Sequence, residues 1–135
     1  DQQTGTIYVV RSLSPEPDIS QLDGQLFKIG VTTGSVKERI STAKDDPTFL
    51  MASVYPVRTF TLINADPKKV EKLIHRFFAD GRLDIEILDR FGKAIHPREW
   101  FLIPLPLIEQ AIKLLMDGSI VDYKYDSKIG EIVRI

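Results

Sequence analysis

The sequence predicts an α/β fold of the α+β type, with a small, mostly antiparallel three-stranded central sheet flanked by helices. Three separate segments, 6–10, 26–31 and 51–63, are rich in β-branched and aromatic residues, which is typical of strands. Two later segments repeat apolar residues at helical spacing. We expect a single domain over residues 1–135, with a core at about 5–103 and a C-terminal helix and hairpin at 104–135.

The first two strands are predicted at 6–10 and 26–31. A polar stretch containing Pro15 and Pro17 lies between them and predicts a loop, so the strands can pair in an antiparallel manner. Ser35, followed three residues later by Glu38, forms a capping box that predicts the start of a helix. Pro47 is expected to end this helical region.

The third strand, at 51–63, contains Pro56, which indicates a bend or the edge of a sheet. Asp66 and Pro67 are suited to the N-cap and the first position of a helix, and Gly81 is suited to a position beyond its end. This helix is predicted to bury a broad apolar face. That face comprises Val70, Leu73, Ile74, Phe77 and Phe78.

The remaining segments predict a short strand at 100–103 and a helix from Pro106 to Gly118. The tail from residue 120 to residue 135 is expected to form a hairpin that turns near Asp126.

Composition places the chain among ordinary globular proteins. No apolar stretch is long enough to span a bilayer and no signal peptide is recognisable, so we expect a cytoplasmic (intracellular) protein without a membrane partner. The absence of cysteine excludes disulfides, thiolate zinc sites and cysteine nucleophiles. The chain begins at Asp1 rather than methionine, which is compatible with a domain excised from a longer protein.

The net charge of −1 argues against a strongly basic protein that binds nucleic acid without regard to sequence. A local basic surface remains compatible with this value, because basic residues are concentrated in the first two thirds of the chain. They are Arg11, Lys28, Lys37, Arg39, Lys44, Lys68, Lys69, Lys72 and Arg76.

Polar residues in four of these segments have the side chains that a hydrolytic site needs. Tyr8 lies in the first strand, Lys28 in the second, Arg39 on the first helix, and Glu71 with His75 on the next helix. A phenol, two cations and a carboxylate can supply a base, charge stabilisation and a metal ligand, which together suffice to cut a phosphodiester with one metal ion.

The order of these residues resembles the GIY-YIG nuclease superfamily, in the branch whose second motif reads Lys-Ile-Gly. The resemblance covers about residues 5–103. The matching motifs are Thr6-Ile7-Tyr8, Lys28-Ile29-Gly30, Arg39, Glu71 with His75, and Glu99-Trp100-Phe101. Thr6 stands where the family has glycine, and Lys28 stands where it has a second tyrosine. An ammonium close to Tyr8 would lower the pKa of that phenol, so the substitution predicts that base chemistry is retained.

The resemblance implies a metal-dependent endonuclease that hydrolyses DNA. Tyr8 would be the general base, Arg39 would stabilise charge on the phosphate, and Glu71 would hold Mg²⁺, for which Mn²⁺ is a candidate substitute. Lys28 and His75 complete the expected catalytic set. Gly30 and Glu99 are secondary candidates. DNA is the expected partner, and a homodimer or a fused specificity domain remain open alternatives.

Two other functions remain compatible with the sequence. The same fold could serve as a nucleic-acid-binding module with weak or no catalysis, or as a protein-interaction domain that uses the last helix and hairpin. Convergence of Tyr8, Lys28, Arg39 and Glu71 in one cleft would favour the nuclease. A tyrosine buried under the core, or a Glu71 held in a structural salt bridge, would favour the alternatives.

Overall fold

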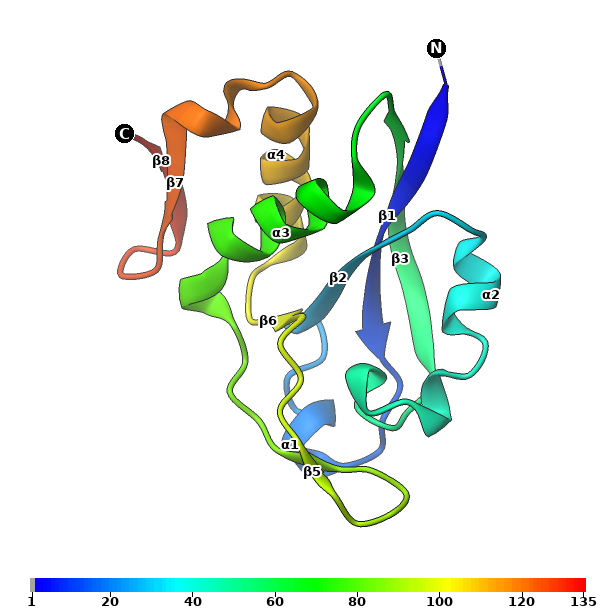
Figure 1. Cartoon of the computed structure of the whole chain (residues 1–135). Coiled ribbons are helices and arrows are strands. Elements are labelled where there is room, and N and C mark those ends of the chain that lie inside the picture. The colour runs from blue at the N-terminus through cyan, green and yellow to red at the C-terminus, as the bar shows by residue number, and fades with distance from the viewer. Residues whose placement is uncertain (1) are drawn as a thin grey trace.

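The computed structural model describes residues 2–135 and contains a central sheet of four antiparallel strands. The strands are β1 (Gln3–Ser12), β2 (Phe27–Thr32), β3 (Val54–Ile63) and β6 (Trp100–Phe101), in the order β3-β1-β2-β6 (Figure 1). The prediction of a three-stranded sheet is therefore wrong by one strand. The short strand predicted at 100–103 joins the sheet, because Trp100 and Phe101 pair with Lys28 and Phe27 of β2.

Strand β1 is buried on both faces and separates two hydrophobic clusters. Ile7 and Val9 face one cluster, which contains residues of α3 (Pro67–Phe77) and α4 (Leu105–Met116). Tyr8 and Val10 face the other cluster, together with Phe49. This second cluster is covered by shorter elements, namely α1 (Pro17–Ser20), α2 (Val36–Ile40), η1 (Ala43–Asp45) and η2 (Pro47–Phe49). Because side chains alternate along a strand, neighbouring residues of β1 support opposite sides of the molecule.

Both predicted helix caps are present. The Ser35 hydroxyl accepts a hydrogen bond from the Glu38 amide at 3.0 Å, and the Asp66 carboxylate accepts one from the Lys68 amide at 3.0 Å. Helix α2 nevertheless ends at Ile40 and gives way to the two 3₁₀ turns before β3. One side chain of the predicted apolar face of α3 differs from expectation, since Leu73 is exposed.

Strand β3 lies at the edge of the sheet, as Pro56 indicated. Val9 pairs with Arg58 and Val10 pairs with Pro56, so the register shifts by one residue at this point. The shift places the proline, which has no backbone N–H to donate, in an irregular part of the ladder.

Among the described residues, 2–135, two small hairpins lie outside the central sheet. The first, β4 (Ile87–Leu88) with β5 (Ala94–Ile95), follows η3 (Ala79–Gly81). The second, β7 (Tyr123–Asp126) with β8 (Glu131–Arg134), follows η4 (Ser119–Asp122) and confirms the predicted C-terminal hairpin. It packs against the core through Tyr125, whose ring centroid lies 5.4 Å from that of Phe78. None of the helices within residues 2–135 combines the length and apolar character needed to cross a membrane.

Candidate active site and metal centre

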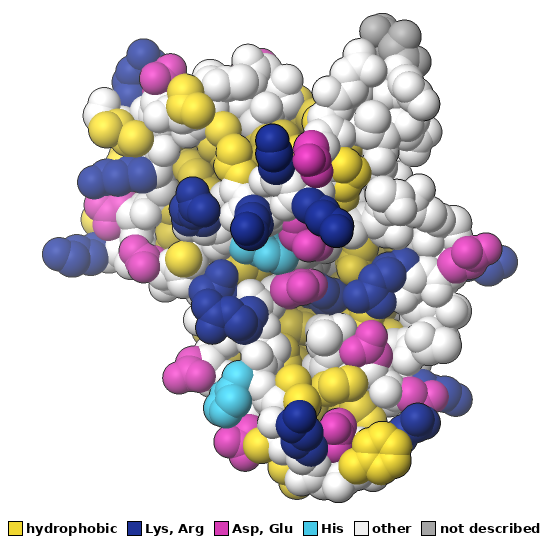
Figure 2. Space-filling model, viewed as in Figure 1, with side chains coloured by type: hydrophobic (Ala, Val, Ile, Leu, Met, Phe, Trp, Pro, Cys, Tyr) yellow, Lys and Arg dark blue, Asp and Glu magenta, His cyan; other side chains and the backbone are white. Residues whose placement is uncertain are grey.

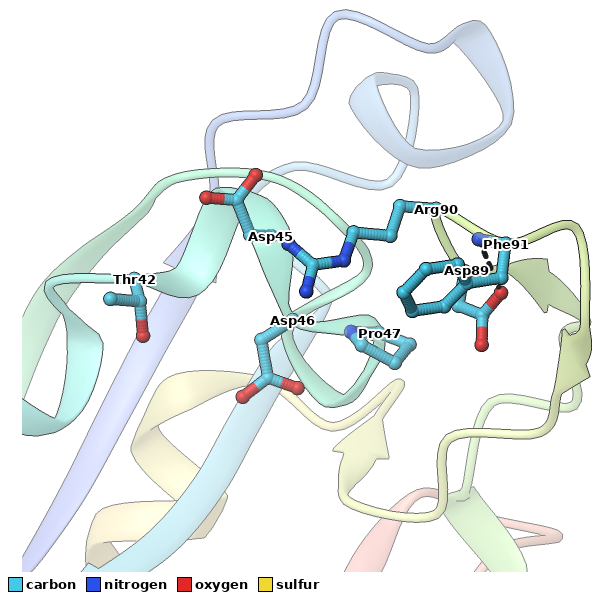
Figure 3. A pocket seen from close by; sticks show the side chains of 7 residues that line it. All are labelled: Thr42, Asp45, Asp46, Pro47, Asp89, Arg90 and Phe91. Carbon is cyan, nitrogen blue, oxygen red and sulfur yellow. Dashed lines mark hydrogen bonds between the residues drawn. The ribbon is translucent and has the colours of Figure 1, made fainter.

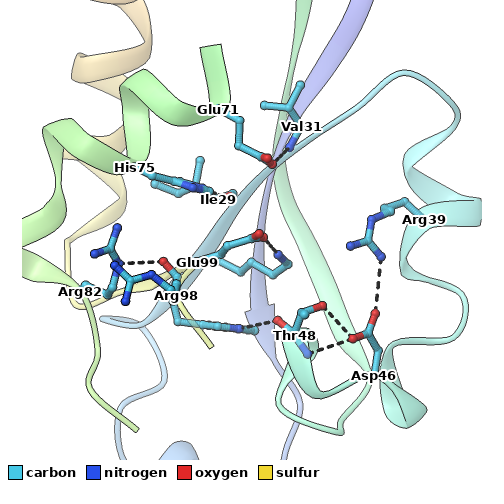
Figure 4. A network of polar contacts seen from close by, with 12 residues as sticks. Ile29, Val31, Arg39, Asp46, Thr48, Glu71, His75, Arg82, Arg98 and Glu99 are labelled. Carbon is cyan, nitrogen blue, oxygen red and sulfur yellow. Dashed lines mark hydrogen bonds and ion pairs between the residues drawn. The ribbon is translucent and has the colours of Figure 1, made fainter. Parts of the chain in front are cut away.

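Glu71, His75 and Glu99 form a group of candidate metal ligands. One ligand atom from each lies within 4.8 Å of those of the other two, and all three side chains are partly buried. Glu71 and His75 lie one turn apart on α3, so they project from the same side of the helix. Glu99 comes from the segment that enters β6, and Figure 4 shows it beside β2, near Glu71 and His75. The pairing of β6 with β2 therefore brings Glu99 to the other two residues.

A backbone contact fixes the orientation of His75. Its Nε2 lies 2.6 Å from the carbonyl oxygen of Ile29. Because a carbonyl oxygen can only accept, Nε2 is the nitrogen that donates in this contact. Metal-ligating histidines commonly donate their second N–H to a backbone carbonyl in this way. The His75 ring also packs on Phe101, with ring centroids 5.4 Å apart.

The two carboxylates are each held by β2. Glu71 Oε2 accepts a hydrogen bond from the Val31 amide at 2.9 Å, while Glu99 Oε1 forms an ion pair with Lys28 Nζ (Figure 4). Each carboxylate thus keeps a second oxygen outside these contacts. In the part of the chain that the structure describes, the Glu71 side chain accepts from the Val31 amide and takes part in no ion pair, so it is a positioned acceptor.

The amine of Lys28 lies in the interior. Its side chain is 0% exposed, and Nζ lies 4.8 Å from the centroid of the Phe49 ring. Burial lowers the pKa of Lys28, and the carboxylate of Glu99 opposes that shift. Glu99 is therefore the charge partner that makes a buried ammonium tolerable at this position.

Gly30 is required by the packing of Tyr8, which lies opposite it in the antiparallel pair. A Cβ at position 30 would lie 2.3 Å from both Cζ and the hydroxyl oxygen of Tyr8. The third residue of the Lys-Ile-Gly motif therefore has a steric role, because only glycine leaves room for the phenol ring. The sequence identified Gly30 as a candidate without this reason.

Tyr8 is 1% exposed and its ring stacks on Phe49. Burial raises the pKa of Tyr8, and the carboxylates of Glu99 and Glu71 raise it further, while Arg39 acts in the opposite direction. The prediction that Lys28 lowers the pKa of this phenol is therefore wrong. The ammonium lies 5.8 Å from the ring centroid, and its charge is largely compensated by Glu99.

Arg39 lies beside Tyr8 and Lys28, at the entrance to this group. Its guanidinium stacks over Phe49 at 4.8 Å and its Nη1 lies 3.6 Å from the carboxylate of Asp46. The other oxygen of Asp46 accepts hydrogen bonds from the amide and hydroxyl of Thr48, at 2.9 and 2.7 Å (Figure 4). The Arg39 side chain is 37% exposed and can therefore reach a ligand at the surface.

Two residues of this site were missed by sequence reasoning. Phe49 contacts Tyr8, Lys28 and Arg39 at once, and Asp46 orients the guanidinium. Asp46-Pro47 carries the same cap signal as Asp66-Pro67, so a turn could have been predicted there. Its position beside β1 and β2 depends on long-range packing that no local pattern specifies.

All seven residues selected from the sequence lie in or beside this site. Figure 2 shows Lys and Arg side chains arranged around a histidine and acidic side chains near the middle of one face. Helix α3 contributes four exposed cations next to Glu71 and His75. They are Lys68, Lys69, Lys72 and Arg76. The face thus combines the partly buried carboxylates of Glu71 and Glu99 with exposed basic residues around them.

Comparison with known proteins identifies the family. The model of the T5orf172 domain matches residues 5–116. The chain is also 43% identical over 112 residues to the "Uncharacterized protein YeeC" of Bacillus subtilis (strain 168), covering 83% of this chain and 29% of that protein. The chain thus spans less than a third of the length of this relative. No solved structure matches it. The prediction of a GIY-YIG nuclease is corrected by the family match, and the chain belongs to the T5orf172 domain family.

Proposed function

We propose that this domain is a metal-dependent endonuclease that hydrolyses DNA phosphodiester bonds. The observation that carries the proposal is the convergence of a three-residue donor set with Tyr8, Lys28 and Arg39 on one face. Five separate segments contribute to this group. Positioned carboxylates, a cation at the surface and a phenol are the parts that phosphodiester hydrolysis uses.

The donor set fits a hard or intermediate divalent cation. Glu71 and Glu99 supply carboxylate oxygens, and His75 supplies a ring nitrogen. Mg²⁺ prefers oxygen ligands and retains several waters, whereas Mn²⁺ also accepts imidazole nitrogen. When bound, such a cation would polarise a phosphate oxygen and offset the negative charges that raise the pKa of Tyr8.

Arg39 would bind the phosphate. Its guanidinium carbon lies over the Phe49 ring, and its partner Asp46 is 3.6 Å away, so a phosphate oxygen can compete for its donors. Lys28 would keep Glu99 in place through their ion pair. Arg39 lies close enough to Tyr8 to stabilise negative charge that develops beside it.

Tyr8 would be the general base once positive charge is bound beside it. The phenol first loses its proton to solvent, and the phenolate then takes a proton from the attacking water. The water oxygen forms a bond to phosphorus while the bond to the leaving oxygen breaks, and the leaving oxygen takes up a proton from solvent. A phenol is already protonated near neutral pH, and with the acidic group unneutralised the raised pKa makes Tyr8 a still weaker acid.

The burial of Tyr8 favours a second candidate function. A phenol that is 1% exposed is a weak base by itself, so the same face could bind nucleic acid without efficient cleavage. The exposed cations of α3 would serve that function equally well.

The test is cleavage of supercoiled plasmid with Mg²⁺, with Mn²⁺ and with chelator. Glu71→Gln is the sharpest variant, since its amide oxygen can still accept from the Val31 amide while the charge is lost. We expect metal-dependent nicking by the native protein and a loss of roughly 100-fold or more in the variant.

Asp80→Asn is the matched control, because it removes an exposed carboxylate just beyond α3. It should nick at the native rate. If the native protein binds DNA yet cuts nothing under any metal condition, the binding module is the correct function.

A further inference from the structure

The hairpin formed by β4 and β5 presents an aromatic side chain to solvent. Phe91 at its tip is 81% exposed. The tip has a fixed shape, because the Asp89 carboxylate accepts from the amides of Phe91 and Lys93 at 2.9 and 2.8 Å, and Gly92 adopts φ +80°. A rigid turn thus holds a large apolar side chain in water, which leaves it available for contact with a flat ligand.

This tip faces the site across a pocket of about 510 Å³. Phe91 lies on one side and Asp45, Asp46 and Pro47 of the 3₁₀ turns lie on the other, while the Arg90 side chain extends from the tip toward the turns (Figure 3). Asp46 also pairs with Arg39, so the pocket borders the residue proposed to bind the phosphate. A group attached to that phosphate can therefore reach the pocket.

The charges around the pocket select the part of a nucleic acid that can enter. Three carboxylates, those of Asp45, Asp46 and Asp89, outnumber the guanidinium of Arg90. Such a lining repels phosphate and accepts hydrogen bonds from neutral N–H groups. A nucleobase meets both conditions, since its face stacks on an aromatic ring and its exocyclic amino group donates to a carboxylate.

One carboxylate is free to accept. Asp46 is engaged by Thr48 and Arg39, and one oxygen of Asp89 is engaged by the hairpin tip. Within residues 2–135, Asp45 takes part in no side-chain hydrogen bond or ion pair. The guanidinium carbon of Arg90 lies over the Phe91 ring, 5.0 Å from its centroid, so a base would stack on the opposite face of the ring.

We propose that this pocket binds an unpaired nucleobase adjacent to the phosphodiester at the site, with the base stacked on Phe91 and its amino group donating to Asp45. The inference rests on the proposed function and specifies its substrate class. A base in a continuous duplex is stacked and paired, so the pocket selects DNA with an unpaired nucleotide beside the cut.

Binding is tested in the Glu71→Gln background, without metal, so that cleavage does not interfere. The probe is a duplex with a single unpaired 2-aminopurine, whose fluorescence falls when the base stacks. We expect quenching on binding, with affinity about 5- to 150-fold weaker after Phe91→Ala and restored by Phe91→Trp. Leu88→Ala is the control, since it removes another exposed apolar side chain of the same hairpin outside this pocket.

Replacing the unpaired base by thymine, which lacks an amino group, should weaken binding, and Asp45→Ala should abolish that preference. The base pocket would be overturned if Phe91→Ala weakened binding of a fully paired duplex as much as binding of the duplex with the unpaired base. It would also be overturned if Phe91→Ala left the quenching of 2-aminopurine unchanged. These outcomes are independent of nuclease activity. If the native protein nicks plasmid but Phe91→Ala does not change binding of the probe, only the base pocket is contradicted. If binding quenches the probe but the native protein does not nick plasmid, only the nuclease proposal is contradicted.

Discussion

The contact between Gly30 and Tyr8 predicts a large effect from one methyl group. In Gly30→Ala the new Cβ would lie 2.3 Å from the phenol oxygen, so the ring or the strand must move. We expect a loss of about 2–3 kcal/mol in the free energy of unfolding, measured in urea, because overpacking a buried site is strained. We also expect plasmid nicking to fall sharply, since the hydroxyl is displaced.

Gly34→Ala provides the comparison for this substitution. Its new Cβ would approach only the Thr32 hydroxyl, at 4.0 Å. Native-like stability and nicking are expected there. Tolerance of alanine at both positions would show that the Tyr8 ring has room to shift.

Tyr8 also predicts a pH dependence of stability. Burial raises the pKa of this phenol in the folded state above its unfolded value near 10. Its contribution is therefore complete below about pH 10 and is lost as pH rises further, because the unfolded state then releases the proton more readily. Tyr8→Phe keeps the ring and removes the titration. The free energy of unfolding, measured in urea, should fall more steeply from pH 8 to pH 11 for the native protein than for the variant. Parallel curves for the two proteins would contradict the effect of burial on the Tyr8 pKa.

The link between β2 and β6 is an ion pair whose two ends differ in burial. Lys28 is 0% exposed, whereas the Glu99 side chain is 32% exposed. Glu99→Ala leaves a buried ammonium without its partner and should cost about 3–5 kcal/mol in urea unfolding. Lys28→Met leaves a carboxylate that water can reach, so a smaller loss is expected. In the double variant the loss should approach that of Lys28→Met, and simple additivity of the two losses would show that the pair is uncoupled.

The sequence correctly predicted the features that depend on residues close together in the chain. The caps at Ser35 and Asp66 and the edge position of Pro56 were all predicted correctly, because each depends on neighbouring backbone groups. The pairing of Trp100 with Lys28 joins positions more than seventy residues apart, and only the folded chain determines it. The fourth strand was therefore not assigned to the sheet.

The site shows the same division between local and long-range information. Residue types selected Tyr8, Lys28, Arg39, Glu71 and His75, and these residues converge. The electrostatic prediction for Tyr8 was wrong, because burial and the position of Glu99 were not visible in the sequence. Phe49 was missed for a related reason, since its three contacts come from distant segments.

At the level of the whole molecule, the chain is nearly neutral, but exposed cations suited to contact DNA phosphates lie beside the site. Lys72 and Arg76 are exposed on α3, each one residue after Glu71 and His75. If both contact DNA phosphates, removing them should reduce the slope of log affinity against log salt by about 2, since each contact contributes about 0.9. Lys124→Ala with Lys128→Ala removes the same charge around the β7–β8 hairpin, which lies away from β2 (Figure 1).

Both double variants are compared in the Glu71→Gln background by titrating a fully paired duplex at several salt concentrations. The α3 variant should lose slope and affinity for paired and unpaired sites alike, because phosphate contacts carry no base information. The hairpin variant should match the parent in slope. A larger change in the salt-dependence slope for the hairpin variant would show that the C-terminal extension, rather than α3, contacts the DNA phosphates. Equal slopes in all three proteins would instead show that binding depends on contacts other than these phosphates, which would leave the base pocket and Arg39 as the main source of affinity.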